Sequence, residues 1–477
     1  MSKNNNIVID ADKVGSIEQH DVRPIPAEDR HGKPKDLFLM WVGANTNYVV
    51  LLTGALLVTL GLSISEAIFA VLVGNLLGCS VLGLSSIMGP RTGSAGIMTS
   101  RPAFGQFGSY LPVIISTLSV LGWFSINSVV ATEGLQELFK IAGLPDNQLM
   151  MWIALGLVLI GEILLAIYGH ATIIAAEKYI SIVLGVLFLG LLLFILPQVD
   201  WSFPNMVVEG DGVTKIGMWI LAMGIIFSYP ISWANFASDY SRYFKKDTNW
   251  KEVAFYAGSG QFIALTLCEI IGVLFAAALG GTLTDPVQQL PGLLPTWYLV
   301  PFLLAVIIGC IATNVPNGYT AGLGLLALRI PISRVKSILV IGAFTLVFRI
   351  ATLIFGQFFT VYQQWLSYII IWTCPWIAVV IVDFFMRKGN YLEKDLMLWG
   401  EGEYWYKTGI FWSGVAAFLI GLVLSIAFAN SAMFVSPIST MYLGGADLSF
   451  EVGLISSGLL YYFFARGQST FARAKTM

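Results

Sequence analysis

The chain has 477 residues, of which 57% are hydrophobic and 11% are charged, and its mean hydropathy is +0.78. Soluble domains carry about 25% charged residues, so this composition excludes an ordinary soluble domain and favours helices that lie in lipid. The formal net charge of −2 gives no reason to expect a nucleic-acid partner.

The N-terminal stretch 1–36 is polar and lacks the apolar segment of a signal peptide. Its second half contains three prolines, Pro24, Pro26 and Pro34, which oppose helix formation. We therefore expect residues 1–36 to form a flexible cytoplasmic tail.

Beyond this tail, apolar stretches recur with lengths near the roughly 20 residues that a helix needs to cross a bilayer. They predict about twelve transmembrane helices, at residues 38–61, 65–88, 109–133, 150–168, 175–196, 215–238, 253–280, 297–327, 335–356, 359–385, 405–428 and 437–464. The sequence thus predicts an all-α polytopic membrane protein with short connections.

The Lys and Arg residues are distributed unequally between the two alternating sets of connections that join the spans. Of the 26 Lys and Arg residues, all but Lys140, Lys215 and Arg349 fall on one alternating set of connections, which includes both chain ends. The connections 197–214 and 281–296 carry acidic but no basic residues. Since cytoplasmic loops carry the Lys and Arg excess, we expect both termini in the cytoplasm and the protein in the cell membrane.

Polar residues interrupt the first span soon after it begins. Asn45, Thr46 and Asn47 follow one another there, after Gly43 and Ala44. Asn, Thr and Gly are weak helix formers, and their donors and acceptors become available where a helix opens. An opened helix is one interpretation, and a polar contact with a neighbouring helix is the other.

The second span and the connection after it are rich in small residues. The spacing of Gly74 and Gly78, like that of Gly318 and Gly322 in the eighth span, favours close helix packing. The following connection, residues 89–108, combines small and aromatic residues. We expect it to pack against the cytoplasmic mouth of the bundle.

In the third span Trp123 and Asn127 are four residues apart, which places them on one helical face. A planar heterocycle needs a stacking surface and amide hydrogen bonds, and this pair offers both, although packing alone also explains a tryptophan in a span. In the sixth span Pro230 removes a backbone donor and predicts a kink. One interruption in each half of a transporter points to a binding site near the bilayer midplane.

Two further spans carry polar groups. Glu269 lies in the middle of the seventh span, where an ionised side chain costs about 2.5–3.5 kcal/mol. It is either a proton carrier or a buried structural carboxyl that is protonated or paired with an arginine. In the eighth span Thr313, Asn314 and Asn317 surround Pro316. They either supply oxygen ligands for a cation or satisfy the backbone of a proline kink.

The remaining reactive residues indicate no catalysis. The four cysteines stand singly in apolar stretches, and the three histidines form no paired motif. We expect reduced thiols, no metal or nucleophile-based active site, no enzyme activity and no cofactor beyond a co-transported ion.

Several motifs stand near the ends of the spans, together with Trp123 in the third. They are Pro90-Arg91-Thr92-Gly93 leading to Ser100-Arg101-Pro102-Ala103-Phe104-Gly105, then Ser238-Asp239-Tyr240-Ser241-Arg242-Tyr243, then Pro375-Trp376, and last Val382-Asp383-Phe384-Phe385 with Arg387-Lys388. In these motifs the chain resembles the nucleobase–cation symporter-1 family, in its purine–cytosine permease branch, from Ile25 through the tenth span.

This resemblance implies a LeuT-like fold. Residues 37–196 would form a first repeat of five helices, and residues 215–385 an inverted second repeat. Residues 386–477 would add two peripheral helices and a cytoplasmic C-terminal tail. The first and sixth spans would break at the midplane.

The resemblance also implies site residues. Trp123 would stack on the substrate, and Asn127 would hydrogen-bond it. The family's second stacking aromatic falls on Pro230, so that its role passes to Tyr229 or Trp233. The other substrate candidates are Asn45, Asn314 and Asn317. The cation candidates are Ala44, Thr46, Gly309, Ala312 and Thr313. The family has two adjacent hydroxyls in the eighth span, and this chain keeps only that of Thr313. The coupled ion is therefore either sodium or a proton, and Glu269 is a candidate proton site.

The predicted function is that of a secondary active transporter with alternating access. It would import a nucleobase, cytosine or a purine, by symport with sodium or a proton. The alternative substrate is a related heterocycle: allantoin, hydantoin, or a pyrimidine or pyridine vitamin precursor. A channel is a distant alternative, because it would need a continuous polar face. The expected partners are the substrate and the lipid bilayer, and the oligomeric state stays open, with a monomer among the options.

Overall fold

A computed structural model describes residues 22–166, 170–283, 286–330, 334–355, 358–431 and 434–468. The predicted tails lie outside the described residues before residue 22 and after residue 468. Within the described part, regular structure is helical apart from two isolated β-bridges.

Long helices form the body of the protein. In the first half they are α1 (Pro34–Asn45), α2 (Tyr48–Thr59), α3 (Ile64–Ser86), α6 (Tyr110–Ile141), α7 (Gln148–Ala166) and α8 (His170–Ile195). In the second half they are α9 (Lys215–Ala234), α11 (Trp250–Ala278), α13 (Thr296–Ala327), α14 (Arg334–Phe355), α15 (Phe358–Met386), α16 (Trp412–Ala427) and α18 (Ser449–Ala465). The short helices between them are α4 (Met88–Thr92), α5 (Arg101–Phe104), α10 (Ala237–Ser241), α12 (Pro286–Gln289) and α17 (Pro437–Tyr442).

Six helices are long and apolar enough to cross a membrane, and the bent pair α1 and α2 makes a seventh span. Five shorter apolar helices complete the set within the described residues. By length and composition the described residues thus show six or seven spans, the five shorter apolar helices lie at the places of further predicted spans, and the all-α fold is confirmed.

The first span is broken where the sequence predicts an opening. Helix α1 ends at Asn45 and α2 begins at Tyr48, and the two axes differ in direction by 65°. Asn47 caps the second half, because its side-chain oxygen accepts a hydrogen bond from the Val50 amide at 3.1 Å.

The sixth span departs from the expectation, implied by the family resemblance, of a break at the midplane. Helix α9 continues through Pro230 for 20 residues to Ala234, and the break comes at Asn235 and Phe236, before α10. Twenty helical residues measure about 30 Å, which is the thickness of a hydrocarbon core. This break therefore lies near one end of the span.

The last two spans also differ from their predicted limits. Helix α16 begins at Trp412 instead of residue 405, since Tyr406 and Lys407 adopt positive φ angles that end the preceding 3₁₀ turn. The predicted span 437–464 is divided into α17 and α18, because Gly444 and Gly445, both with positive φ, interrupt it.

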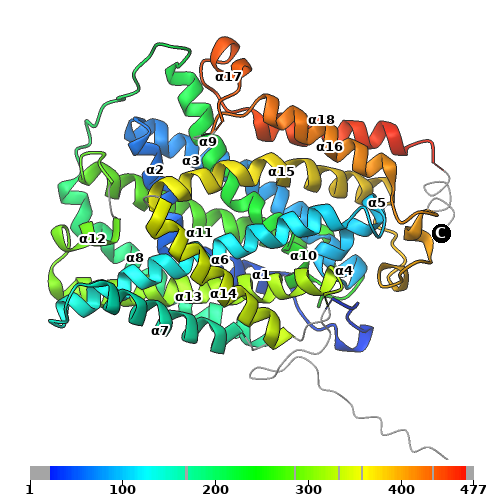
Figure 1. The fold of residues 1–477 in the computed structure, drawn as a ribbon, viewed down its shortest axis with the longest axis horizontal. Helices are drawn as coiled ribbons and strands as arrows, with labels where there is room; N and C mark the ends of the chain where they lie inside the picture. Colours follow the sequence, from blue (N-terminus) through cyan, green and yellow to red (C-terminus); the bar gives the residue numbers. More distant parts are fainter. Residues whose placement is uncertain are drawn as a thin grey trace, which may run out of the picture.

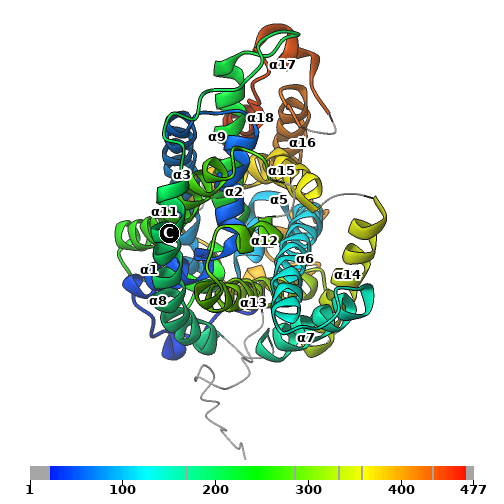
Figure 2. The same cartoon turned by 90° about the vertical axis from the view of Figure 1, so that its left-hand side faces the viewer.

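The helices lie side by side along the long axis of the molecule (Figure 1). Seen along that axis, α2 and α12 lie near the centre, with α3, α9, α15, α6, α13, α8 and α11 around them (Figure 2). Helices α16 and α18 pack on each other and on α15 at the periphery, as expected of two additional helices.

Helix α3 packs closely on α9 through the predicted GxxxG pair. A Cβ atom on Gly74 would lie 2.8 Å from the carbonyl oxygen of Met223, and one on Gly78 would clash with the ring of Pro230. Close packing, the interpretation of this motif, is confirmed at these two glycines. The contact also covers Pro230 with a neighbouring helix.

Helices α4, α5 and α10 gather at one end of the bundle, which we call the α4–α5 end, and α12 lies at the other, the α12 end (Figure 1). The connection 89–108 is largely buried at the α4–α5 end, as predicted. Arg101 donates to the Leu396 carbonyl at 2.6 Å, and burial lowers the pKa of its guanidinium to about 10.

Part of the predicted flexible tail is packed at this end. Ile25 is buried, and its amide donates to the Gly93 carbonyl at 2.9 Å. Arg30 donates to the carbonyl oxygens of Ile25 and Pro90 and pairs with Glu393 at 3.2 Å. Residues 22–33 therefore form an ordered strap across the α4–α5 end.

Candidate substrate site

Three aromatic rings from different helices meet inside the bundle. Trp123 of α6 lies 4.8 Å from Tyr229 of α9 and 6.1 Å from Tyr362 of α15, measured between ring centroids. All three side chains are buried. Because α6 and α9 come from different halves of the chain, the group lies where the two predicted repeats meet.

Buried polar atoms beside this aromatic group lack protein partners. The Asn127 amide donates to the Trp123 carbonyl at 2.9 Å, while Asn127 Oδ1 and Trp123 Nε1 have no partner among the described residues. At the end of α1, Asn45 donates to the Trp41 carbonyl at 2.8 Å, and its Oδ1 also has no partner among the described residues. A buried polar atom costs free energy unless something satisfies it, so these atoms favour a polar ligand.

The second predicted aromatic candidate lies elsewhere. Trp233 packs edge-on against Trp41, with ring centroids 5.6 Å apart, and Trp41 packs in the same way on Tyr240 at 5.5 Å. Of the two candidates for the second stacking role, the structure therefore brings Tyr229 to Trp123 and places Trp233 in a separate cluster.

The two amides of the eighth span, on α13, form a chain of hydrogen bonds. Asn317 donates to Asn314 Oδ1 at 3.1 Å, and the Asn314 amide donates to Glu162 at 2.7 Å. Asn314 also donates toward the Phe124 carbonyl and the Ser128 hydroxyl, and Ser128 donates to Glu162 at 2.8 Å. This network ties α13 to α6 and α7, and it occupies the donors of Asn314 within the protein.

The predicted cation candidates lie mostly together, at the break of the first span. The Thr313 hydroxyl lies within donating distance of two carbonyl oxygens, that of Gly309 at 2.9 Å and that of Ala44 at 3.1 Å. The Thr46 carbonyl oxygen is 3.5 Å from where a Cβ on Gly309 would stand. Ala312 is buried on the same helix.

Glu269 is a buried carboxyl between α3 and α11. Asn75 of α3 donates to its Oε2 at 2.5 Å, and its Oε1 has no partner among the described residues. The partner of this carboxyl is thus an amide, where the sequence analysis considered an arginine.

Three residues of this region were not among the predicted site residues. Tyr362 stands in an apolar run with other aromatic residues, so nothing local marks it. Glu162 stands out as a carboxyl in an apolar stretch, yet its partners come from two other helices. Asn47 was visible as part of the polar turn, and its contacts with Thr313 at 2.9 Å and Tyr229 at 3.5 Å emerge only in three dimensions.

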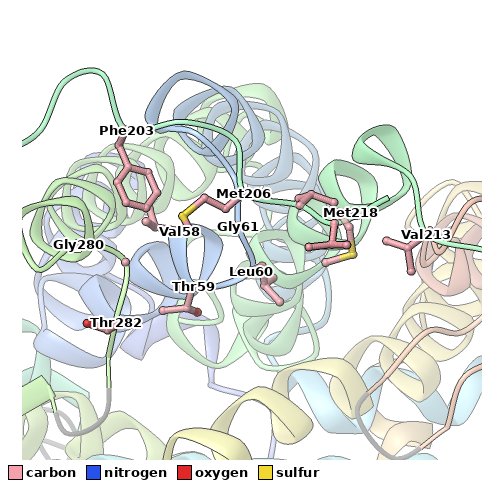
Figure 3. A pocket seen from close by; sticks show the side chains of 13 residues that line it. Val58, Thr59, Leu60, Gly61, Phe203, Met206, Val213, Met218, Gly280 and Thr282 are labelled. Carbon is pink, nitrogen blue, oxygen red and sulfur yellow. The ribbon is translucent and has the colours of Figure 1, made fainter. Parts of the chain in front are cut away.

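A cavity of about 490 Å³ lies at the α12 end, away from this aromatic group. Figure 3 shows its lining, which includes Val58, Phe203, Met206 and Met218 and is mostly apolar. Near the break of the sixth span, a space of about 10 Å³ next to Asn235 has room for about one water molecule.

Residues 24–453 match the family described as permease for cytosine/purines, uracil, thiamine, allantoin. The chain belongs to this permease family. Over 456 residues it is 28% identical to YxlA of Bacillus subtilis (strain 168), named as a purine-cytosine permease, and the match covers 94% of this chain and 95% of YxlA. The predicted family is therefore confirmed, and it is a family of permeases.

Two other comparisons cover part of the chain or its fold. This permease is 30% identical over 244 residues to the vitamin B6 transporter TPN1 of Saccharomyces cerevisiae, which is 50% of this chain and 40% of TPN1. Its fold matches that of Mhp1, a nucleobase-cation-symport-1 family transporter, in a closed conformation with bromovinylhydantoin bound. The TM-score is 0.77 at 18% identity, covering 97% of this chain and 100% of Mhp1. The fold of this permease is LeuT-like, as predicted.

Proposed function

We propose that this permease is a secondary active transporter that imports a nucleobase, cytosine or a purine, by symport with a cation, sodium or a proton. It works by alternating access in the plasma membrane, with both termini in the cytoplasm. The family and the distribution of Lys and Arg support this proposal.

One observation carries the choice of substrate class. Trp123 and Asn127 lie on one face of α6, and the indole of Trp123 packs against Tyr229. Both side chains are buried, and each has a polar atom without a partner among the described residues. A flat, nitrogen-rich ring fits both needs, because its face stacks on the indole and its edge carries hydrogen-bond donors and acceptors.

Coupling to one monovalent cation is sufficient for accumulation. The membrane potential supplies about 2.3 kcal/mol per 100 mV for each charge, and each tenfold ion gradient adds about 1.4 kcal/mol. Together these drive several-hundred-fold accumulation of a neutral base. Glu269 and Glu162 are two buried carboxyls inside the spans that could carry a coupled proton.

A related heterocycle is the second candidate substrate class. The partial similarity to a vitamin B6 transporter and the fold shared with a hydantoin-bound transporter favour a test of pyridine and hydantoin rings. Allantoin and pyrimidine vitamin precursors belong to the same group.

The test is uptake of labelled cytosine, adenine, hypoxanthine, allantoin, a hydantoin and pyridoxine into proteoliposomes that hold the purified chain. We expect one of the bases to enter saturably and to accumulate when an inward ion gradient is imposed. Entry that never exceeds equilibrium under any sodium or proton gradient would indicate a channel. Uptake of a non-base alone would select the second substrate class.

A further inference from the structure

At the break of the first span, a carbonyl oxygen at the end of α1 faces α13. The last four carbonyl groups of a helix have no partner inside it. One of them, that of Ala44, lies 3.1 Å from the Thr313 hydroxyl, which is 2.9 Å from the Gly309 carbonyl oxygen. Freed carbonyls with a hydroxyl form a ligand set suited to a hard cation such as sodium.

An amide nitrogen already stands among these oxygens. Asn47 Nδ2 lies 2.9 Å from Thr313 Oγ1 and 3.3 Å from the Ala44 carbonyl oxygen. It is also 3.5 Å from the Tyr229 hydroxyl, which faces Trp123. The Asn47 side chain is fully buried.

The orientation of this amide is fixed by the start of α2. The Val50 N–H donates to Asn47 Oδ1 at 3.1 Å, and only the oxygen of a carboxamide can accept that bond. The nitrogen must then point the other way, toward Thr313 and Ala44. Reversing the amide would lose the helix cap and turn an acceptor toward the Ala44 carbonyl.

We propose that the Asn47 amide group takes the place of a sodium ion between the first and eighth spans, so that this permease does not bind sodium there. The N–H groups of Asn47 bear partial positive charge and use the lone pairs that a cation would need, that of Thr313 above all. An ion could enter only by displacing Asn47 from both Thr313 and the cap of α2. The inference rests on the proposed function in one respect only. If the protein is a symporter, its coupled ion must bind at another site.

The first experiment uses the purified full chain without any substrate. Its melting temperature is measured at equal ionic strength in sodium, potassium and choline chloride, and binding of labelled ²²Na⁺ is measured by scintillation proximity. We expect the same melting temperature in the three salts and no saturable sodium binding. Saturable binding that Thr313→Val removes would overturn the proposal.

The second experiment replaces the Asn47 amide nitrogen, a hydrogen-bond donor, with an oxygen that can bind sodium. Asn47→Asp keeps an oxygen that caps α2 and places a carboxylate oxygen where the amide nitrogen stands. We expect this variant to gain saturable sodium binding and a higher melting temperature in sodium than in choline, and Thr313→Val in the same chain to remove both gains. Asn45→Asp is the matched control, since it adds the same charge to the same break on a side chain directed at Trp41.

If Asn47→Asp does not fold, Asn47→Ser replaces it, because serine also caps a helix and removes the amide nitrogen. A folded Asn47→Asp or Asn47→Ser chain that stays indifferent to sodium would contradict the proposal. Failure of nucleobase uptake would leave these results intact, because none of them requires a substrate. The two proposals therefore succeed or fail separately.

Discussion

Trp123 and Tyr229 face each other between α6 and α9, with ring centroids 4.8 Å apart and planes inclined by 58°. Contact distances between carbon atoms are about 3.5–4.0 Å, so a flat substrate held between two rings would need a separation of about 7 Å. These two rings leave no such gap. A substrate that stacks on Trp123 must therefore displace Tyr229 or approach the indole from its other face.

Truncating the indole of Trp123 should lower the affinity for the substrate. Stacking of a base on an aromatic side chain contributes about 1–3 kcal/mol, so we expect Trp123→Ala to weaken substrate binding by about five- to 150-fold, with Trp123→Phe intermediate. Thermal-shift titration or isothermal calorimetry measures the change. Trp152→Ala, at an exposed position on α7, is the control. Equal affinities of Trp123→Ala and the unaltered chain would remove Trp123 from the site.

Asn127 should discriminate substrates by their donors. Its nitrogen is committed to the Trp123 carbonyl and its Oδ1 is available, so we expect it to accept a hydrogen bond from a ring N–H or an exocyclic amine. One such bond is worth about 0.5–1.5 kcal/mol net, which predicts a loss of about two- to 13-fold for Asn127→Ala. Analogues that lack the donor should show no further loss in that variant. Asn205→Ala, in the connection before α9, serves as the comparison.

The carboxyl oxygens of Glu162 should stabilise the packing of α6, α7 and α13 by accepting hydrogen bonds. Glu162→Ala leaves the donors of Asn314 and Ser128 without their carboxyl partner, and an unsatisfied buried donor costs about 1–3 kcal/mol. Glu162→Gln keeps an oxygen for Asn314, while the Ser128 hydroxyl can turn to the Phe124 carbonyl, 2.9 Å away. We therefore expect the alanine variant to melt clearly below the glutamine variant in detergent. Identical melting temperatures would show that this network is dispensable.

The contact between α2 and α11 should tolerate no added methyl group. A Cβ on Gly54 would clash with the backbone of Glu269, whereas one on Gly156 of α7 would meet nothing within 4 Å. Overpacking costs about 1–3 kcal/mol or more, so Gly54→Ala should lower the melting temperature. Gly156→Ala should leave it unchanged or raise it slightly, because alanine is the better helix former. A stable Gly54→Ala protein would mean that the two helices can separate without cost.

Hydropathy predicted the places of the spans, and low helix propensity favoured an opening of the first one, which the family resemblance also implied. Long apolar runs have to be helical in lipid, and the Asn45 to Asn47 turn has low helix propensity in any surroundings. The break of the sixth span was misplaced because Pro230 weakens a helix locally, whereas its contact with α3 is set by Gly78, far away in the sequence.

The spacing of Trp123 and Asn127 predicted that they share one helical face, and the family resemblance implied their place in a substrate site. The placement of Tyr362 against Trp123, and of Glu162 against Asn314, depends on how four different helices pack. No local pattern encodes such distances.

The first span divides into two halves of 12 residues, whereas α9 runs unbroken for 20 residues before its break. The two helix breaks thus lie at different depths. The break of the first span lies halfway along it, and that of the sixth lies close to the α4–α5 end. Close packing of Gly74 on Met223 and of Gly78 on Pro230 joins α9 to α3, so we expect these two helices to move together. We expect the bundle to open at the α12 end by bending at the break of the first span. We expect it to open at the α4–α5 end by bending at the break of the sixth span, so that the two breaks do not act as symmetric hinges.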